Sequence, residues 1–145
     1  MKIRKTALGI LCAIGIACLC ACTSKTSNYD AYHKEVNKLY EQIVTTGAII
    51  DTIDTENDNY KQELYDSLDD LKKSFDDFAK IEPPKEFKDC KMLSEKASSY
   101  IDNSSKCFHF AFDEGYKEEM FEAGKSNYNE AIKCINYMGE VLQNK

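Results

Sequence analysis

The amino-acid sequence predicts an all-α fold, an antiparallel up-down-up-down four-helix bundle that follows an N-terminal signal peptide. Four segments beyond residue 28 have apolar residues at steps of three and four, which is the spacing of one helix face. Helix-breaking residues separate these segments and the connections are short, so consecutive helices should be antiparallel neighbours. The alternating stretch Phe108–Phe112 would be an isolated strand, so we interpret it as helix.

The first 21 residues have the composition of an export signal rather than that of a membrane span. Lys2, Arg4 and Lys5 precede an apolar run from Ala7 to Ala21. About 15 residues with a rise of ~1.5 Å each span about 22 Å, which is less than the bilayer core of about 30 Å. A basic start, a short apolar core and small residues at its end together indicate a signal peptide over residues 1–21.

The apolar run ends in the tetrapeptide Leu19-Cys20-Ala21-Cys22, which resembles the lipobox of bacterial lipoproteins. Leu19 and Ala21 match the aliphatic and small positions that precede the modified cysteine. The resemblance implies that Cys22 receives a diacylglyceryl group on its sulfur and becomes the N-terminus after cleavage. Cys18 and Cys20 match the motif less well, and an ordinary secretory signal cut near Ala21 is the alternative.

Lipidation of Cys22 would hold the protein at a membrane without a transmembrane helix. Two acyl chains hold a protein stably, whereas one chain gives only marginal binding. The small polar residues in 22–28 predict a flexible, lipidated tether. The chain as a whole resembles small bacterial lipoproteins with a helical mature domain. We therefore expect the mature protein on the extracytoplasmic face of the cell membrane, close to the lipid surface.

The residues after the signal peptide are strongly acidic. Without Lys2, Arg4 and Lys5, 16 of the 19 basic residues remain beside 25 acidic ones, which gives a net charge of −9. Such a charge disfavours binding to nucleic acid and to anionic lipid head groups. The attachment to the membrane must therefore come from the acyl chains. Residues 29–145 have the length of one domain.

The first two helices are expected over about 29–53 and 57–81, where apolar stripes follow a helical period. The connection Asp54–Asn59 consists of poor helix formers that suit turns and helix caps. Within it, Thr55 and Asp58 have the spacing of a capping box. The apolar stripe keeps its phase across this connection, so a single kinked helix is the alternative.

The last two helices are expected over about 85–113 and 116–143. Pro83-Pro84 stops the second helix and suits the first turn of the third. Gly115 marks the third connection. A ladder of apolar residues at steps of four continues across Gly115, so a continuous helix is the alternative there; its members are Phe108, Phe112, Tyr116 and Met120.

Cys90, Cys107 and Cys134 are an odd number of cysteines for an oxidising compartment. If the third turn centres near residue 114, the level of Cys134 in the bundle differs from that of Cys90 by only ~6 Å. Cys90 and Cys134 are thus the one pair that could form a disulfide, provided that their Cα atoms approach within about 7 Å. The alternative is three small core residues. None of them has the close pair spacing of a zinc site.

Aromatic residues near the end of the third helix are the best indication of an interaction surface. Phe110 is rotated by about 200° from Phe108 around a helix, so both cannot easily share the core stripe. We hypothesise that Phe110, with His109 and Tyr116, edges an exposed contact patch. The alternative is a broad apolar face that is buried between two neighbouring helices.

The sequence contains no recognisable catalytic signature, neither a Gly-x-Ser-x-Gly elbow nor a phosphate-binding glycine loop. We therefore expect a protein that is not an enzyme and has no cofactor, a tethered binding or scaffolding module for a protein or small ligand. His33 and His109 lack the Glu-x-x-His motif of di-iron bundles. The alternative is a metal- or haem-binding bundle that uses His109 with Met92 or Met138, or the acidic connection.

Overall fold

The computed structural model describes residues 26–55, 57–113 and 115–143. Within these ranges it has four α-helices and no strand, so the prediction of an all-α bundle is confirmed and the stretch Phe108–Phe112 is helical. The signal peptide, Cys22 and most of the tether lie outside the described residues. The elements are α1 (Thr26–Thr52), α2 (Asp58–Ala79), the short 3-10 helix η1 (Lys85–Phe87), α3 (Cys90–Phe112) and α4 (Glu118–Gln143).

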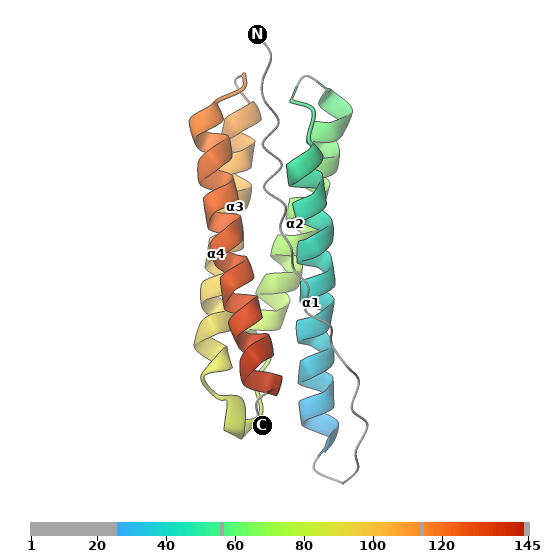
Figure 1. Ribbon diagram of the computed structural model, residues 1–145, viewed down its shortest axis with the longest axis vertical. Coiled ribbons are helices and arrows are strands. Elements are labelled where there is room, and N and C mark those ends of the chain that lie inside the picture. The colour runs from blue at the N-terminus through green and yellow to red at the C-terminus, as the bar shows by residue number, and fades with distance from the viewer. Residues whose placement is uncertain (1–25, 56, 114, 144–145) are drawn as a thin grey trace.

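The helices alternate in direction along one long axis (Figure 1). Each helix contacts the next one in the chain, and α1 contacts α4, which closes the ring. The α3–α4 interface is the most extensive of these contacts and the α1–α4 interface the least. We call the lower end of Figure 1, with the start of α1, the residues 80–89 and the end of α4, the proline end. The opposite end, with the connections 53–57 and 113–117, is the glycine end.

The core of the bundle contains the apolar stripes that define the four helices. A fully buried Leu, Ile, Phe or Met side chain stabilises the folded state by about 1.5–3 kcal/mol relative to an exposed one. Burial of these stripes therefore explains why each segment is helical in the fold, whatever its intrinsic propensity. The largest side chains with almost no exposure are Leu64, Leu68, Leu71, Phe75, Ile101, Phe108, Ile135, Met138 and Leu142.

The first connection separates α1 from α2, so the alternative of one kinked helix is wrong. The predicted capping box at Thr55 is also wrong, because Asn57 is the N-cap of α2. Asn57 has an extended backbone, and its side chain accepts a hydrogen bond from the Asn59 amide at 3.0 Å. Asn caps a helix at least as well as Thr, so the helix begins at Asp58, beside the stronger cap.

The second connection is longer than expected. The helix α2 ends at Ala79, and α3 begins at Cys90 rather than near residue 85. A 3-10 turn lies between them, closed by the Phe87 amide, which donates to the Pro84 carbonyl at 2.8 Å. This turn places Phe87 in the core with only 4% of its surface exposed. The second helix thus ends ahead of the two prolines, as predicted, but the next helix starts only after the buried side chain of Phe87.

The third connection turns at Gly115, so the alternative of a continuous helix across it is wrong. Gly115 has a φ of 94°, a conformation that favours glycine. The Lys117 amide donates to the Ala111 carbonyl at 2.8 Å and closes the end of α3. This turn brings α4 back along α3, where the Ser104 hydroxyl donates to the Gly124 carbonyl at 2.9 Å.

Candidate functional site

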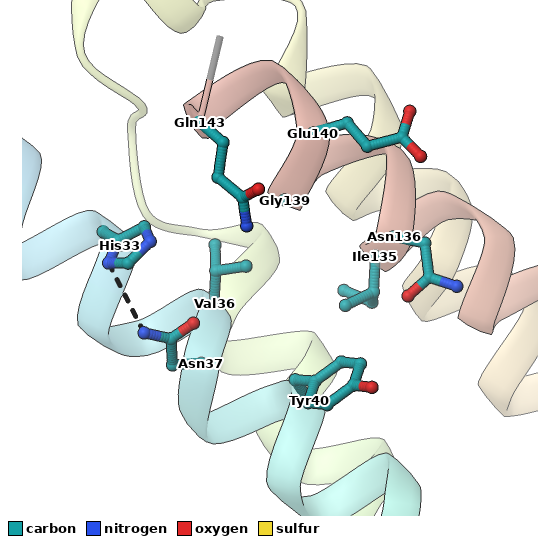
Figure 2. A pocket seen from close by; sticks show the side chains of 9 residues that line it. All are labelled: His33, Val36, Asn37, Tyr40, Ile135, Asn136, Gly139, Glu140 and Gln143. Carbon is teal, nitrogen blue, oxygen red and sulfur yellow. Dashed lines mark hydrogen bonds between the residues drawn. The ribbon is translucent and has the colours of Figure 1, made fainter. Parts of the chain in front are cut away.

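A groove between α1 and α4 is the first candidate site (Figure 2). Val36 and Ile135 lie between the two helices and give the groove an apolar interior. Gly139 contributes to the opening, because a Cβ added there would meet no atom within 4 Å. The lining consists of His33, Val36, Asn37, Tyr40, Ile135, Asn136, Gly139, Glu140 and Gln143.

Polar contacts border this groove near the proline end. The Tyr29 hydroxyl donates to the Leu142 carbonyl at 2.8 Å and ties α1 to α4. The Tyr29 ring stacks on His33, with 5.8 Å between ring centroids. His33 Nδ1 in turn lies 3.4 Å from the Asn37 amide nitrogen. The cavity volume is about 50 Å³, far below the roughly 300–1,000 Å³ of pockets that enclose drug-sized ligands.

The second candidate site is a set of aromatic side chains at the glycine end. Tyr65 of α2 and His109 of α3 stack with ring centroids 3.9 Å apart and planes at 26°. The Tyr65 hydroxyl donates to Asp113 Oδ1 at 3.2 Å. Burial and, next, the Asp113 carboxylate raise the pKa of Tyr65 to about 12. Tyr65 therefore remains a protonated hydrogen-bond donor throughout the physiological pH range.

Tyr116 belongs to a neighbouring cluster of rings at the same end. Its ring centroid lies 5.7 Å from that of Phe112 and 5.9 Å from that of Phe121. The two phenylalanines form the edge of the core, whereas Tyr116 is 47% exposed. Burial raises the pKa of Tyr116, and the nearby carboxylates of Glu118 and Glu122 raise it further. The cluster therefore presents an aromatic surface in an acidic environment.

The structure divides the three residues of the hypothesised contact patch. Phe110 lies on the outer surface of α3 and is 63% exposed. His109 contacts Tyr65, and Tyr116 contacts the phenylalanine cluster, but within the described ranges Phe110 forms no ring contact with either of them. All three are at the glycine end without forming one cluster. Whether they contact a partner remains a prediction.

Sequence reasoning did not identify Tyr65 as a partner of His109. Residues 65 and 109 are equidistant from residue 87, the last residue of η1. Antiparallel helices bring such residues to the same level, which is the argument that we applied to the cysteines across the third connection. The sequence predicted that this connection centres on Pro83-Pro84, which would have placed His109 level with about residue 58, so the pairing with Tyr65 could not be predicted.

The three cysteines of the described residues carry thiols, and no disulfide joins Cys90 to Cys134. Both are buried, Cys90 beside Tyr32 and Cys134 near Lys96 and Glu130. Burial raises the pKa of the Cys134 thiol, which lowers its reactivity. The Tyr32 hydroxyl is buried and has no hydrogen-bond partner among the described residues.

The residues named for a metal or haem site lie far apart. Met92 and His109 are 17 positions apart in α3, which corresponds to about 26 Å along a helix. Met138 lies in α4 near the proline end, whereas His109 lies near the glycine end. Neither methionine can therefore ligate one iron together with His109. No group of three potential metal-ligating residues occurs within the described part of the chain.

None of the described helices is both long and apolar enough to span a membrane. The family model with the description "Domain of unknown function" (DUF7018) matches residues 25–137. The chain belongs to this family. The matched segment covers α1, α2, α3 and most of α4, so the family corresponds to the helical bundle. No curated protein and no solved structure matches the chain.

Proposed function

We propose that this protein is a lipid-anchored, extracytoplasmic binding or scaffolding module that is not an enzyme. In this proposal Cys22 carries a diacylglyceryl anchor, and the helical bundle contacts a protein or small ligand. The observation that carries the proposal is the sequence Leu19-Cys20-Ala21-Cys22 directly ahead of a domain whose first helix begins at Thr26.

The surface of the bundle supports a binding role. Three of the four exposed aromatic side chains of the described residues, Tyr60, Phe110 and Tyr116, lie at the glycine end, and the fourth is Tyr137. The glycine end is opposite to the start of α1 and therefore to the proposed anchor. Tyr and Phe side chains are enriched where proteins contact their partners. Tyr116 rests on the edge of the core, so its ring is held in place before a partner arrives and loses little conformational freedom on binding.

The lipid anchor is tested by replacing Cys22 in a bacterial host that processes lipoproteins. We expect the wild-type protein to fractionate with membranes and to carry a diacylglyceryl group on its N-terminal residue by mass spectrometry. Cys22→Ala should abolish both properties. Cys20→Ala is the matched control, because it changes a neighbouring cysteine of the same motif and should leave both unchanged. An unmodified wild-type protein that washes off membranes without detergent would refute the anchor.

The binding surface is tested by crosslinking in intact cells, followed by purification of the protein. We expect Tyr116→Ser to reduce the yield of a specific crosslinked partner. Met92→Ser is the control, because it removes an exposed large apolar side chain (69% exposed) near the proline end. Equal yields for both variants and the wild type would contradict a role of the glycine end in binding.

A further inference from the structure

The short tether limits where the bundle can lie relative to a lipid anchor. Cys22 precedes Thr26 by four residues, which span at most about 14 Å when fully extended. The helix α1 has 27 residues and is therefore about 40 Å long. If Cys22 is acylated, as proposed above, the proline end must lie near the lipid. The tether alone allows the bundle to stand upright or to lie flat.

The charges of the bundle distinguish these two orientations. The described residues of the outer two turns and the connections of the glycine end, 45–55, 57–65, 106–113 and 115–125, contain eight acidic residues and four lysines. The corresponding described parts of the proline end, residues 26–33, 72–97 and 136–143, contain eight acidic residues and seven lysines. The net charge of these described residues is thus −4 at the glycine end and −1 at the proline end.

An anionic membrane therefore repels the glycine end more strongly than the proline end. The surface potential of such a membrane decays over about 8 Å at physiological ionic strength. An upright bundle holds its glycine end about 40 Å from the surface, several decay lengths away. A bundle lying flat would bring acidic side chains of the glycine end within one decay length. Electrostatic repulsion therefore favours the upright orientation.

The second connection has the side chains that an interfacial contact needs. Ile81, two residues after the end of α2, is 37% exposed although it is a large apolar residue. Lys85 and Lys88 are exposed nearby and form no ion pair with any other described residue. Lysines of this kind can extend along apolar surface and keep their charge at the head groups. Pro83 and Pro84 restrict the backbone between Ile81 and these lysines.

We propose that the proline end docks on the lipid surface, with Ile81 at the interface, so that the bundle stands upright and points its acidic, aromatic glycine end away from the membrane. The proposal rests on the lipid anchor of Cys22. Beyond that anchor, it specifies which surface of the bundle contacts the bilayer and in which direction the glycine end, the proposed partner-binding surface, faces.

The natural absence of tryptophan makes this orientation measurable. The lipidated protein, produced with one introduced tryptophan, is reconstituted into phosphatidylglycerol-containing vesicles whose acyl chains are brominated and quench nearby fluorescence. Ile81→Trp reports on the proline end. Four exposed positions on or beside different helices report on the remaining surface, namely Val44 (α1), Tyr60 (α2), Phe110 (α3) and Tyr116 (before α4).

We expect the tryptophan at position 81 to lose most of its emission and the other four to keep theirs. Quenching at position 44, 60, 110 or 116 equal to that at position 81 would show a bundle that lies flat and would overturn the proposal. An unquenched tryptophan at position 81 in protein that floats with the vesicles would overturn it as well. Protein that does not float with the vesicles would instead refute the lipid anchor, and the orientation with it.

Discussion

Two glycines of α4 face different neighbours. The difference explains why α4 packs closely against α3 but leaves a groove against α1. A Cβ added to Gly124 would lie 3.1 Å from ring carbons of Phe108 in α3. A Cβ added to Gly139 would meet nothing within 4 Å, beside the groove to α1. The same residue type therefore permits close packing against α3 and leaves space against α1.

The comparison shows that the role of a small helix residue depends on what lies opposite to it. The Phe108 ring occupies the space that a side chain at position 124 would need, and the Ser104 hydroxyl donates a hydrogen bond to the Gly124 carbonyl. At Gly139 no side chain fills the space, and the two helices are tied at Tyr29 and Leu142 instead. The variants below test this contrast by their effect on the free energy of unfolding.

The largest effect is expected for Phe108→Ala. Phe108 is fully buried and contacts both Gly124 and Phe121. Removal of a buried phenylalanine ring lowers the unfolding free energy by about 3–5 kcal/mol. Urea denaturation followed by circular dichroism measures this loss. A loss below 1 kcal/mol would show that the α3–α4 interface does not depend on this ring.

Gly124→Ala should have the second largest effect. The added methyl group must displace the Phe108 ring, and overpacking of a core costs about 1–3 kcal/mol. The gain in helix propensity, about 1 kcal/mol, offsets part of this cost. We expect a net loss of about 1 kcal/mol, measured by the same denaturation. A more stable variant would mean that Phe108 moves aside freely.

Gly139→Ala should act in the opposite direction. The added methyl group enters open space, so only the higher helix propensity of alanine counts, and it raises the unfolding free energy by up to about 1 kcal/mol. The same substitution at two positions of one helix thus changes sign. Destabilisation by Gly139→Ala would contradict the open groove between α1 and α4.

Phe110→Ser should have the smallest effect. Phe110 is mostly exposed, and surface substitutions usually change the unfolding free energy by less than about 0.5 kcal/mol. Thermal unfolding of this variant should therefore resemble that of the wild type. A loss of several kcal/mol would place the ring in the core and exclude it from a contact surface.

The existence of the four helices could be predicted from the sequence, but not all of their boundaries. Apolar residues at steps of three and four predict each helix, because the same side chains that create the pattern are buried in the fold. Pro83-Pro84 predicts the end of α2, but the pattern does not reveal that Phe87 enters the core through a 3-10 turn before α3 begins. Likewise, the sequence predicted a capping box at Thr55, whereas the backbone geometry shows that Asn57 is the N-cap of α2.

The groove could not be predicted, since it depends on the spacing of two helices that are distant in sequence. Nothing in the residues around Gly139 reveals that α1 approaches α4 less closely than α3 does. The aromatic glycine end was predicted in part. The rotation of Phe110 away from the core follows from helix geometry, whereas the stacking of His109 on Tyr65 requires the relative level of α2 and α3.

The hydrogen bond from Tyr29 to Leu142 has a consequence for the order in which the bundle folds. It joins residues 113 positions apart, whereas the bond from Ser104 to Gly124 joins residues 20 positions apart. For a flexible chain, closing the longer loop costs about 1.5 kcal/mol more in entropy. The contact of α1 with α4 should therefore form last and open first, and the amide hydrogens of α1 should exchange with solvent faster than those of α3.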